Sequence, residues 1–181
     1  LDGDLDFVRR LARGDLRQIA VRETVDFSTL LRDVNDSLRP LAEAKGLALE
    51  AAIPDGLRMI GDIDGLIRLF VNLLDNAIQF TERGGITVAA SREDNGKMRV
   101  TIADTGCGIA AEHLPHIFDR FYRVDKSRTS RGVGLGLAIA LEIARSHGGT
   151  IDVSREEGSG TTFVVLLKDP LSAANELLER E

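Results

Sequence analysis

The segment from Asp62 to Ile78 constrains the fold most, because its apolar residues recur at helical spacing along its whole length. They form one broad stripe, made of Ile63, Leu66, Ile67, Phe70, Leu73, Leu74, Ala77 and Ile78. A helix with such a stripe must pack it against another layer of structure. Asp62 stands where an N-cap is expected, and a glycine pair at 84–85 ends the region.

Segments with strand-like alternation supply that second layer. Residues 86–91 and 98–103 are joined across Asn95-Gly96, a favoured hairpin turn, and another pair meets at a Gly-Ser-Gly turn. One of the expected helices contains Pro40, which should kink or end it. The other expected elements are strands at 19–27, 47–53, 150–155 and 161–167 and helices at 29–44, 135–147 and 170–181. This order predicts helices on one face of a largely antiparallel sheet.

Composition excludes several classes of function. The 181 residues, enough for one domain, include 29 acidic and 23 basic side chains, and this net charge of −6 disfavours nucleic-acid binding. A single cysteine, Cys107, cannot form an internal disulfide and is typical of a reducing cytoplasm. The histidines lack the partners of a zinc site, and no apolar run approaches the roughly 20 residues needed to cross a bilayer.

Three amides follow one another on a single face of the main helix. Asn72, Asn76 and Gln79 lie at i, i+4 and i+7, roughly opposite the apolar stripe. A plain solvated face is one interpretation, although such faces usually carry Glu, Lys or Arg, which form helices better than Asn. The other interpretation is a Mg²⁺ site, because neutral amide oxygens suit a hydrated Mg²⁺ that is shared with phosphates.

Two glycine-containing segments have the character of binding loops. In DTGCGI, Asp104 ends a strand, and Gly106 and Gly108 allow close approach of a ligand. This is either an ordinary turn or a carboxylate placed to accept an exocyclic amine such as that of adenine. In GVGLGL, glycines open a helix whose bare N–H groups would bind an anion, unless the segment is only a flexible loop. Cations cluster just before it: Arg120, Arg123, Lys126, Arg128 and Arg131.

In this order, the blocks NLLDNAIQFT, DTGCGI, HIFDRFYR and GVGLGL resemble the N, G1, F and G2 boxes of sensor histidine kinases. HGGTIDVSREEGSGTTFVVLL resembles the closing hairpin of the same family, and the resemblance covers about Asp26 to Lys168. It implies an α+β fold, the two-layer α/β sandwich with helices on one face of a mixed, mostly antiparallel sheet. Gyrase, mismatch-repair and heat-shock chaperone ATPases share this sandwich.

The resemblance also implies a role for each matching position. Asn76 would hold Mg²⁺, with Asn72 and Arg123 as the other catalytic residues. Asp104 would accept the adenine amine, in a pocket formed by Phe80, Gly106, Gly108, Ile109 and Thr162. A lid from Tyr122 and Arg123 through Lys126 to Arg131 would close over the triphosphate of ATP. Backbone groups would bind the phosphates at Gly132, Val133, Gly134, Leu135, Gly136 and Leu137.

The chain departs from the pattern of the family at two places, and the segments on either side of the catalytic domain also resemble parts of these kinases. Gln79 stands where the family commonly has Lys or Arg, and the lid is short. Residues 1–22 resemble the end of the second dimerisation helix with its linker, 23–169 the ATP-binding catalytic domain, and 170–181 a helical tail. The expected partners are the protein's own dimerisation domain, which carries the phospho-accepting histidine, and a response-regulator receiver domain. We expect a cytoplasmic domain of a homodimeric parent, without membrane contact of its own; whether the parent is anchored in the inner membrane is left open.

Three alternatives to the histidine kinase differ in their chemistry. ATPases of this fold place a water-activating Glu one turn before the metal-binding Asn, where this chain has Asn72, which is no base. A related kinase that phosphorylates serine fits the F box less well. A nucleotide-binding pseudokinase remains open, because Gln79 and the short lid would both weaken catalysis.

Overall fold

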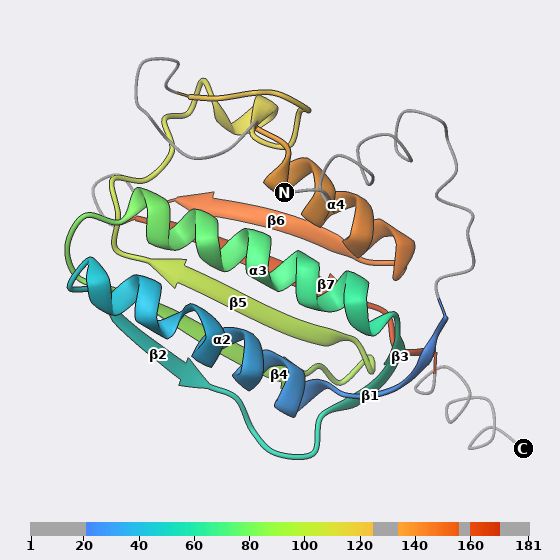
Figure 1. Ribbon diagram of the computed structural model, residues 1–181. Coiled ribbons are helices and arrows are strands. Elements are labelled where there is room, and N and C mark those ends of the chain that lie inside the picture. The colour runs from blue at the N-terminus through green and yellow to red at the C-terminus, as the bar shows by residue number, and fades with distance from the viewer. Residues whose placement is uncertain (1–20, 125–133, 156–159, 171–181) are drawn as a thin grey trace, which may run out of the picture.

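Alternation of buried and exposed side chains along the strands decides how the chain is layered. The computed structural model describes residues 21–124, 134–155 and 160–170. Along β5 (Met98–Asp104) and β7 (Thr161–Leu167) every second residue is buried, so one face of the sheet lies against the core. Three helices cover that face (Figure 1), namely α2 (Phe27–Ala44), α3 (Ile63–Phe80) and α4 (Gly136–Ser146).

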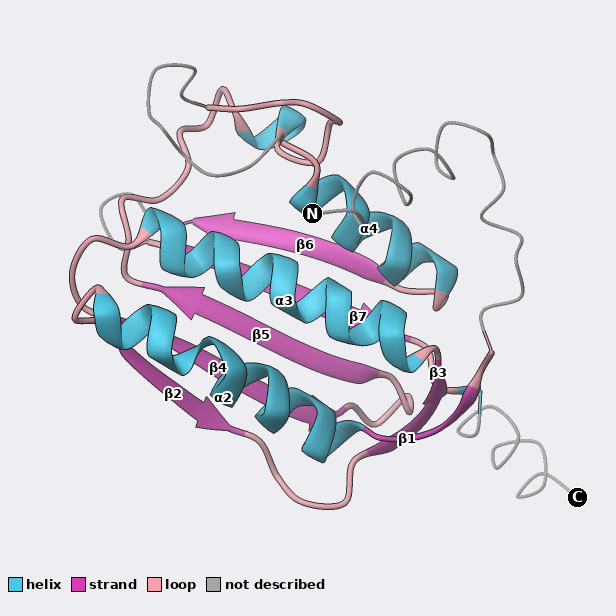
Figure 2. Ribbon diagram, in the orientation of Figure 1, coloured by secondary structure: helices cyan, strands magenta, loops and turns pink. Residues whose placement is uncertain are grey.

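The main sheet is mixed and mostly antiparallel, as the resemblance implied. Its strand order is β2-β4-β5-β7-β6, with the outer strand β2 parallel to β4 and every other pair antiparallel. Figure 2 shows this sheet behind the helices. The remaining bounds are β2 (Ala48–Ala52), β4 (Gly85–Arg92) and β6 (Thr150–Arg155).

A second, two-stranded sheet was not expected from the sequence. In it, β1 (Glu23–Asp26) pairs antiparallel with β3 (Arg58–Gly61), directly before α3 begins. The pattern of β3 was too short to recognise, because four residues alternate over barely two periods. The strand predicted at 19–27 also extends one residue too far toward the C-terminus, because Phe27 is already the first residue of α2.

The core confirms the apolar stripe of α3 with one correction. Leu66, Phe70 and Leu73 are buried, and Phe70 meets Phe27 of α2 edge to face with ring centroids 5.7 Å apart. Ile67, assigned to the stripe, is 39% exposed, and Leu69 is fully buried instead. Because the sheet and both neighbouring helices pack around α3, the buried side of this helix is set by three partners.

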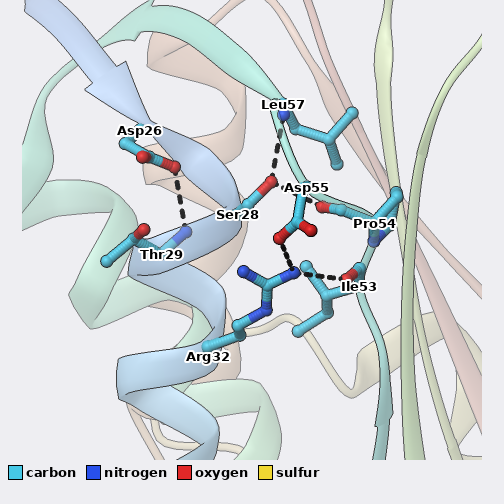
Figure 3. A network of polar contacts seen from close by, with 8 residues as sticks. All are labelled: Asp26, Ser28, Thr29, Arg32, Ile53, Pro54, Asp55 and Leu57. Atoms are coloured by element: carbon cyan, nitrogen blue, oxygen red, sulfur yellow. Dashed lines mark hydrogen bonds and ion pairs between the residues drawn. The ribbon is translucent and has the colours of Figure 1, made fainter.

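Helix α2 begins in a polar network that ties it to the loop between β2 and β3 (Figure 3). Asp26 caps it by accepting a hydrogen bond from the Thr29 N–H at 3.0 Å, and this bond is the main reason that the pKa of Asp26 is lowered. Ser28 Oγ donates to Pro54 O and accepts from Leu57 N–H, at 2.6 and 3.0 Å. The helix then runs through Pro40 to Ala44, so Pro40 does not end it.

Several predictions lie outside the described residues. They include most of the linker at 1–22, most of the lid, and the tail at 171–181. Within the described part of the chain, none of the helices combines the length and the apolar character that a membrane span requires.

Candidate functional site

Asp104 lies at the end of β5 with its carboxylate held by two backbone groups. Its Oδ1 accepts from the N–H of Gly106 at 2.8 Å and from the N–H of Thr161 at 3.3 Å. The residue is only 7% exposed, and burial raises the pKa of this carboxyl while the two backbone donors oppose that rise. Since both bonds use Oδ1, the other oxygen is available to a donor from a ligand.

Three backbone segments meet around this carboxylate. A Cβ on Gly106 would stand 2.5 Å from the carbonyl oxygen of Phe80, at the end of α3. A Cβ on Gly160, whose φ is +93°, would stand 1.8 Å from the carbonyl oxygen of Asp104. Glycine is required at both positions, because any side chain would push these segments apart. Phe80 itself is 43% exposed.

Of the two threonines that begin β7, Thr161 is the one whose backbone N–H reaches the carboxylate of Asp104, and the place of Thr162 in a base pocket stays a prediction. Strand alternation turns Thr162 to the face of the sheet that carries no helix, where it lines a hollow together with Asp104, Glu50 and Thr87. Thr161 faces the core beside Asp104, with 5% of its surface exposed. The period of two in TTFVVLL was enough to find this, because Thr161 and the buried Phe163 must share a face.

A second cluster joins the amides of α3 to the start of α4. A Cβ on Gly136 would stand 3.8 Å from Oδ1 of Asn72, so the glycine leaves space beside this amide. The Nδ2 atom of Asn72 is buried and has no hydrogen-bond partner. Asn76 and Gln79 are half-buried on the same helix, so their face is not the fully solvated one of the plain interpretation. A buried unpaired N–H is costly, and it indicates a place for an acceptor.

The N-terminus of α4 has no capping side chain. Leu135 occupies the N-cap position and makes no side-chain hydrogen bond to the first turn. The first backbone bond of the helix runs from Ile139 N–H to Leu135 O at 2.9 Å, so the N–H groups before it point out of the helix end. Gly136 at the start of α4 lies next to Asn72, so the helix end and this amide together offer N–H donors suited to an anion.

The residues just before the lid contact this surface through the backbone. Phe121 donates its N–H to the carbonyl oxygen of Gly134 at 2.9 Å and adopts a left-handed φ of +64°. Tyr122 and Arg123 follow and are half-buried. The hydroxyl of Tyr122 is hydrogen-bonded to His113 at 2.7 Å, a contact that the sequence did not reveal because His113 belongs to none of the recognised blocks.

The remaining predicted site residues either pack against the hydrophobic core or lie outside the residues that the structure describes. Three of them are partly buried and pack against the hydrophobic core, namely Ile109, Leu135 and Leu137. Their side chains therefore connect the site to the core. Lys126, Gly132 and Val133 lie outside the described residues. Within the described residues there is no group of three His, Cys, Asp or Glu side chains that could hold a metal.

Comparisons with known proteins identify the family to which this chain is similar. Residues 61–171 match the family described as histidine kinase-, DNA gyrase B-, and HSP90-like ATPases. The sensor protein SrrB of Staphylococcus aureus is 37% identical over 88% of this chain and 28% of SrrB. The signal transduction histidine-protein kinase BaeS of Escherichia coli is 33% identical over 90% of this chain and 36% of BaeS. The chain thus spans between 28% and 36% of the length of these relatives.

Among solved structures, full-length ShkA in complex with AMPPNP superimposes with a TM-score of 0.69 and 34% identity. The match covers 81% of this chain and 30% of ShkA. The nucleotide analogue in that crystal structure is a property of ShkA, and the shared part is the two-layer fold described above.

Proposed function

The chain belongs to the family of histidine kinase-, DNA gyrase B- and HSP90-like ATPases, and we propose that it binds Mg²⁺–ATP and transfers the γ-phosphate to a histidine on another domain. The observation that carries this proposal is the pair of polar clusters at the two ends of one helical segment. Asp104 and Phe80 form one cluster, and Asn72 with Gly136 forms the other. Asn72 and Phe80 are eight residues apart, which is roughly 12 Å along a helix, a span suited to an extended nucleotide.

Each cluster suits one end of ATP. The free oxygen of Asp104 can accept the exocyclic amine of adenine, and the exposed ring of Phe80 offers a face beside the base. The uncapped end of α4 and the unpartnered Nδ2 of Asn72 both present N–H donors to phosphate oxygens. A ligand with an amine at one end and anionic oxygens at the other satisfies both clusters.

Asn76 is the proposed protein ligand of Mg²⁺. The residues present fit this ion, because Mg²⁺ prefers oxygen ligands, keeps several waters, and takes much of its coordination from substrate phosphates. Asn76 is half-buried one turn after Asn72, so it shares the face of the helix that carries Asn72. When bound, Mg²⁺ neutralises charge on the phosphates.

The site supports phosphoryl transfer to a separate nucleophile better than hydrolysis. A water-activating base is expected one turn before Asn76, and the residue there is Asn72, whose amide takes up no proton at ordinary pH. The protein's own work is therefore positioning and charge stabilisation, with Arg123 supplying positive charge near the phosphates. The acceptor histidine would belong to the dimerisation domain of a two-component sensor kinase, and a response-regulator receiver domain would take the phosphoryl group next.

Calorimetry with Mg²⁺ and AMPPNP tests the binding. Asp104→Ala should lower affinity about 10- to 100-fold, because the adenine amine then lacks a buried partner. Asp152→Ala is the matched control, since Asp152 is exposed on β6 and should bind as the wild type does. Equal affinity in the wild type and Asp104→Ala would reject the adenine assignment.

Transfer is tested by mixing the domain with labelled ATP and a separately made helical hairpin that carries the acceptor histidine. Labelled hairpin should appear with the wild type and be absent with Asn76→Ala. A nucleotide-sensing pseudokinase is the second candidate, favoured by the neutral Gln79 one turn beyond Asn76. Tight nucleotide binding without any transfer would favour that candidate.

A further inference from the structure

His113 and Tyr122 are joined side chain to side chain just outside the two clusters. A hydrogen bond of 2.7 Å links Nδ1 of His113 to the hydroxyl of Tyr122. Both residues are half-buried, and their ring centroids are 6.1 Å apart. Between them the chain makes a short 3-10 turn (Leu114–His116), which returns Tyr122 to the side of His113.

Tyr122 is anchored toward the phosphate end of the site. Its neighbour Phe121 donates the backbone N–H to Gly134 O at 2.9 Å, and Gly134 lies two residues before α4. The left-handed φ of +64° at Phe121 is unusual for a bulky residue, so the surrounding contacts must hold the backbone there. Arg123 follows Tyr122 directly. Contacts that hold the backbone of Tyr122 in place therefore also fix the position from which the Arg123 side chain extends.

His113 is anchored toward the base end. Its backbone N–H donates to the carbonyl oxygen of Ala110 at 2.9 Å. Ala110 lies two residues after Gly108, in the loop that follows Asp104. The carboxylate of Glu112 lies 3.5 Å from Nε2 of His113. This carboxylate favours the ring proton on Nε2, which leaves Nδ1 as the acceptor for the Tyr122 O–H.

We propose that His113 is a positioning residue, whose hydrogen bond to Tyr122 fixes Arg123 and Gly134 relative to the loop that follows Asp104. The role rests on the proposed function, because it matters only if one ligand contacts both clusters. A ligand that reaches from Asp104 to the start of α4 needs these two segments at a fixed separation. The hydrogen bond supplies a direct side-chain tie between them.

His116 provides a matched control on the same turn. Its ring also packs near Tyr122, with centroids 5.4 Å apart, but its Nδ1 is paired with Asp119 Oδ2 at 2.9 Å and its side chain is 54% exposed. A substitution such as His116→Asn therefore removes a neighbouring imidazole without removing the hydrogen bond to the Tyr122 hydroxyl.

Tyr122 makes this tie directly observable. The chain contains one tyrosine and no tryptophan, so near-ultraviolet tyrosine absorption and emission report on Tyr122 alone. We would compare the wild type with His113→Phe, His113→Asn, Tyr122→Phe and His116→Asn. Asn at position 113 can place an acceptor near the position of Nδ1, whereas Phe keeps a ring without any acceptor.

The expected results are specific to the hydrogen bond. His113→Phe should shift the tyrosine spectrum and weaken binding of Mg²⁺–AMPPNP about 3- to 10-fold, and His113→Asn should restore both. Tyr122→Phe should weaken binding by a similar factor, and the double variant His113→Phe/Tyr122→Phe should be no weaker than either single variant. His116→Asn should bind as the wild type does.

Two results would overturn the positioning role. One is wild-type affinity in His113→Phe while Asp104→Ala has lost binding. The other is an additive loss in the double variant, which would mean that the two side chains act separately. A wild-type domain that binds no nucleotide would instead reject the proposed function and the positioning role with it.

Discussion

The start and the middle of α3 differ in how their polar groups are satisfied. Where α3 begins, beside β1 and β3 (Figure 1), His147 Nε2 accepts the backbone N–H of Asp62 at 3.0 Å. Asp169, 4% exposed, accepts from Ile60 N–H at 3.3 Å and pairs with Arg92 at 2.8 Å. At the middle of the helix, Asn72 keeps a buried Nδ2 without a partner.

This difference separates groups that hold the fold from groups kept for a ligand. A buried polar group that the protein itself satisfies adds stability or costs little, whereas one left unpaired costs free energy until something binds it. Substitutions at the start of α3 should therefore lower stability and leave nucleotide affinity alone. Substitutions at the phosphate cluster should do the reverse.

The largest effect on stability is expected at Asp169. Asp169→Ala removes the partner of Arg92 and the acceptor of Ile60 N–H, and should lower the free energy of unfolding by about 2–3 kcal/mol. The estimate is below that for a fully buried pair because the Arg92 side chain is 37% exposed. Urea denaturation would measure the loss, and affinity for Mg²⁺–AMPPNP should stay unchanged. A large drop in affinity with intact stability would contradict the separation of these two regions.

Asn72→Leu should give the opposite result. Replacing the unpartnered amide with an apolar side chain of similar size should leave the melting temperature unchanged or raise stability by about 1 kcal/mol. Nucleotide affinity should fall about 10-fold or more, because a donor to the phosphates is lost. Asn35→Leu is the control, since Asn35 also has a buried unpartnered atom but lies on α2. Wild-type affinity in Asn72→Leu would argue against a phosphate contact.

The start of α3 should also be sensitive to acid through His147. Its Nδ1 donates to Ile143 O at 2.9 Å while Nε2 accepts from Asp62 N–H, which requires the neutral ring. Burial lowers the pKa of His147 below 6.5, with smaller opposing effects of the Ile143 hydrogen bond and Asp62 and a smaller lowering by Arg22. Protons then bind the unfolded chain more readily than the folded one.

The stabilising contribution of the neutral His147 is therefore complete above pH 6.5 and is lost as the pH falls toward the lower pKa of the folded state. The slope for this one proton is at most about 1.4 kcal/mol per pH unit. His147→Gln keeps an acceptor for Asp62 N–H but does not titrate, so its stability should depend less on pH in denaturation measured between pH 5 and 7. An identical slope in both proteins would show that other groups cause it.

The smallest effect is expected at the cap of α2. Asp26→Ala removes the acceptor of Thr29 N–H and should lower stability slightly, without any change in nucleotide affinity. Asp26→Asn should recover most of that loss, because it keeps an acceptor at the N-cap. Thermal melting would measure both variants. Wild-type stability in Asp26→Ala would show that this cap contributes nothing.

Much of the fold followed from local patterns. The period of α3 and the two hairpins were predicted nearly to the residue, because each depends on side chains close together in the sequence. β3 was missed because four residues carry little pattern, and pairing with β1 stabilises them from more than thirty residues away. Asp62 does occupy the N-cap position of α3 but makes no side-chain cap hydrogen bond, and its backbone N–H is bound by His147.

For the candidate site, the sequence predicted which residues belong to it better than it predicted which of them are in contact. The sequence located Asp104, the amides of α3 and the glycines before α4 through blocks that each lie within one segment. It assigned Thr162 to the base pocket, which stays a prediction, and it did not foresee that the backbone N–H of Thr161 reaches Asp104. It also passed over His113, because one histidine in a loop carries no periodic signal.

The sequence by itself determined which elements form and which chemical groups this chain can offer to a ligand. Only the tertiary structure decided which of those groups meet: Thr161 with Asp104, Asn72 with Gly136, and His113 with Tyr122. The reason is physical. Secondary structure and turn type depend mainly on neighbouring residues, whereas these contacts depend on how strands pair and helices pack, and a shift of one residue in a strand turns a side chain to the opposite face.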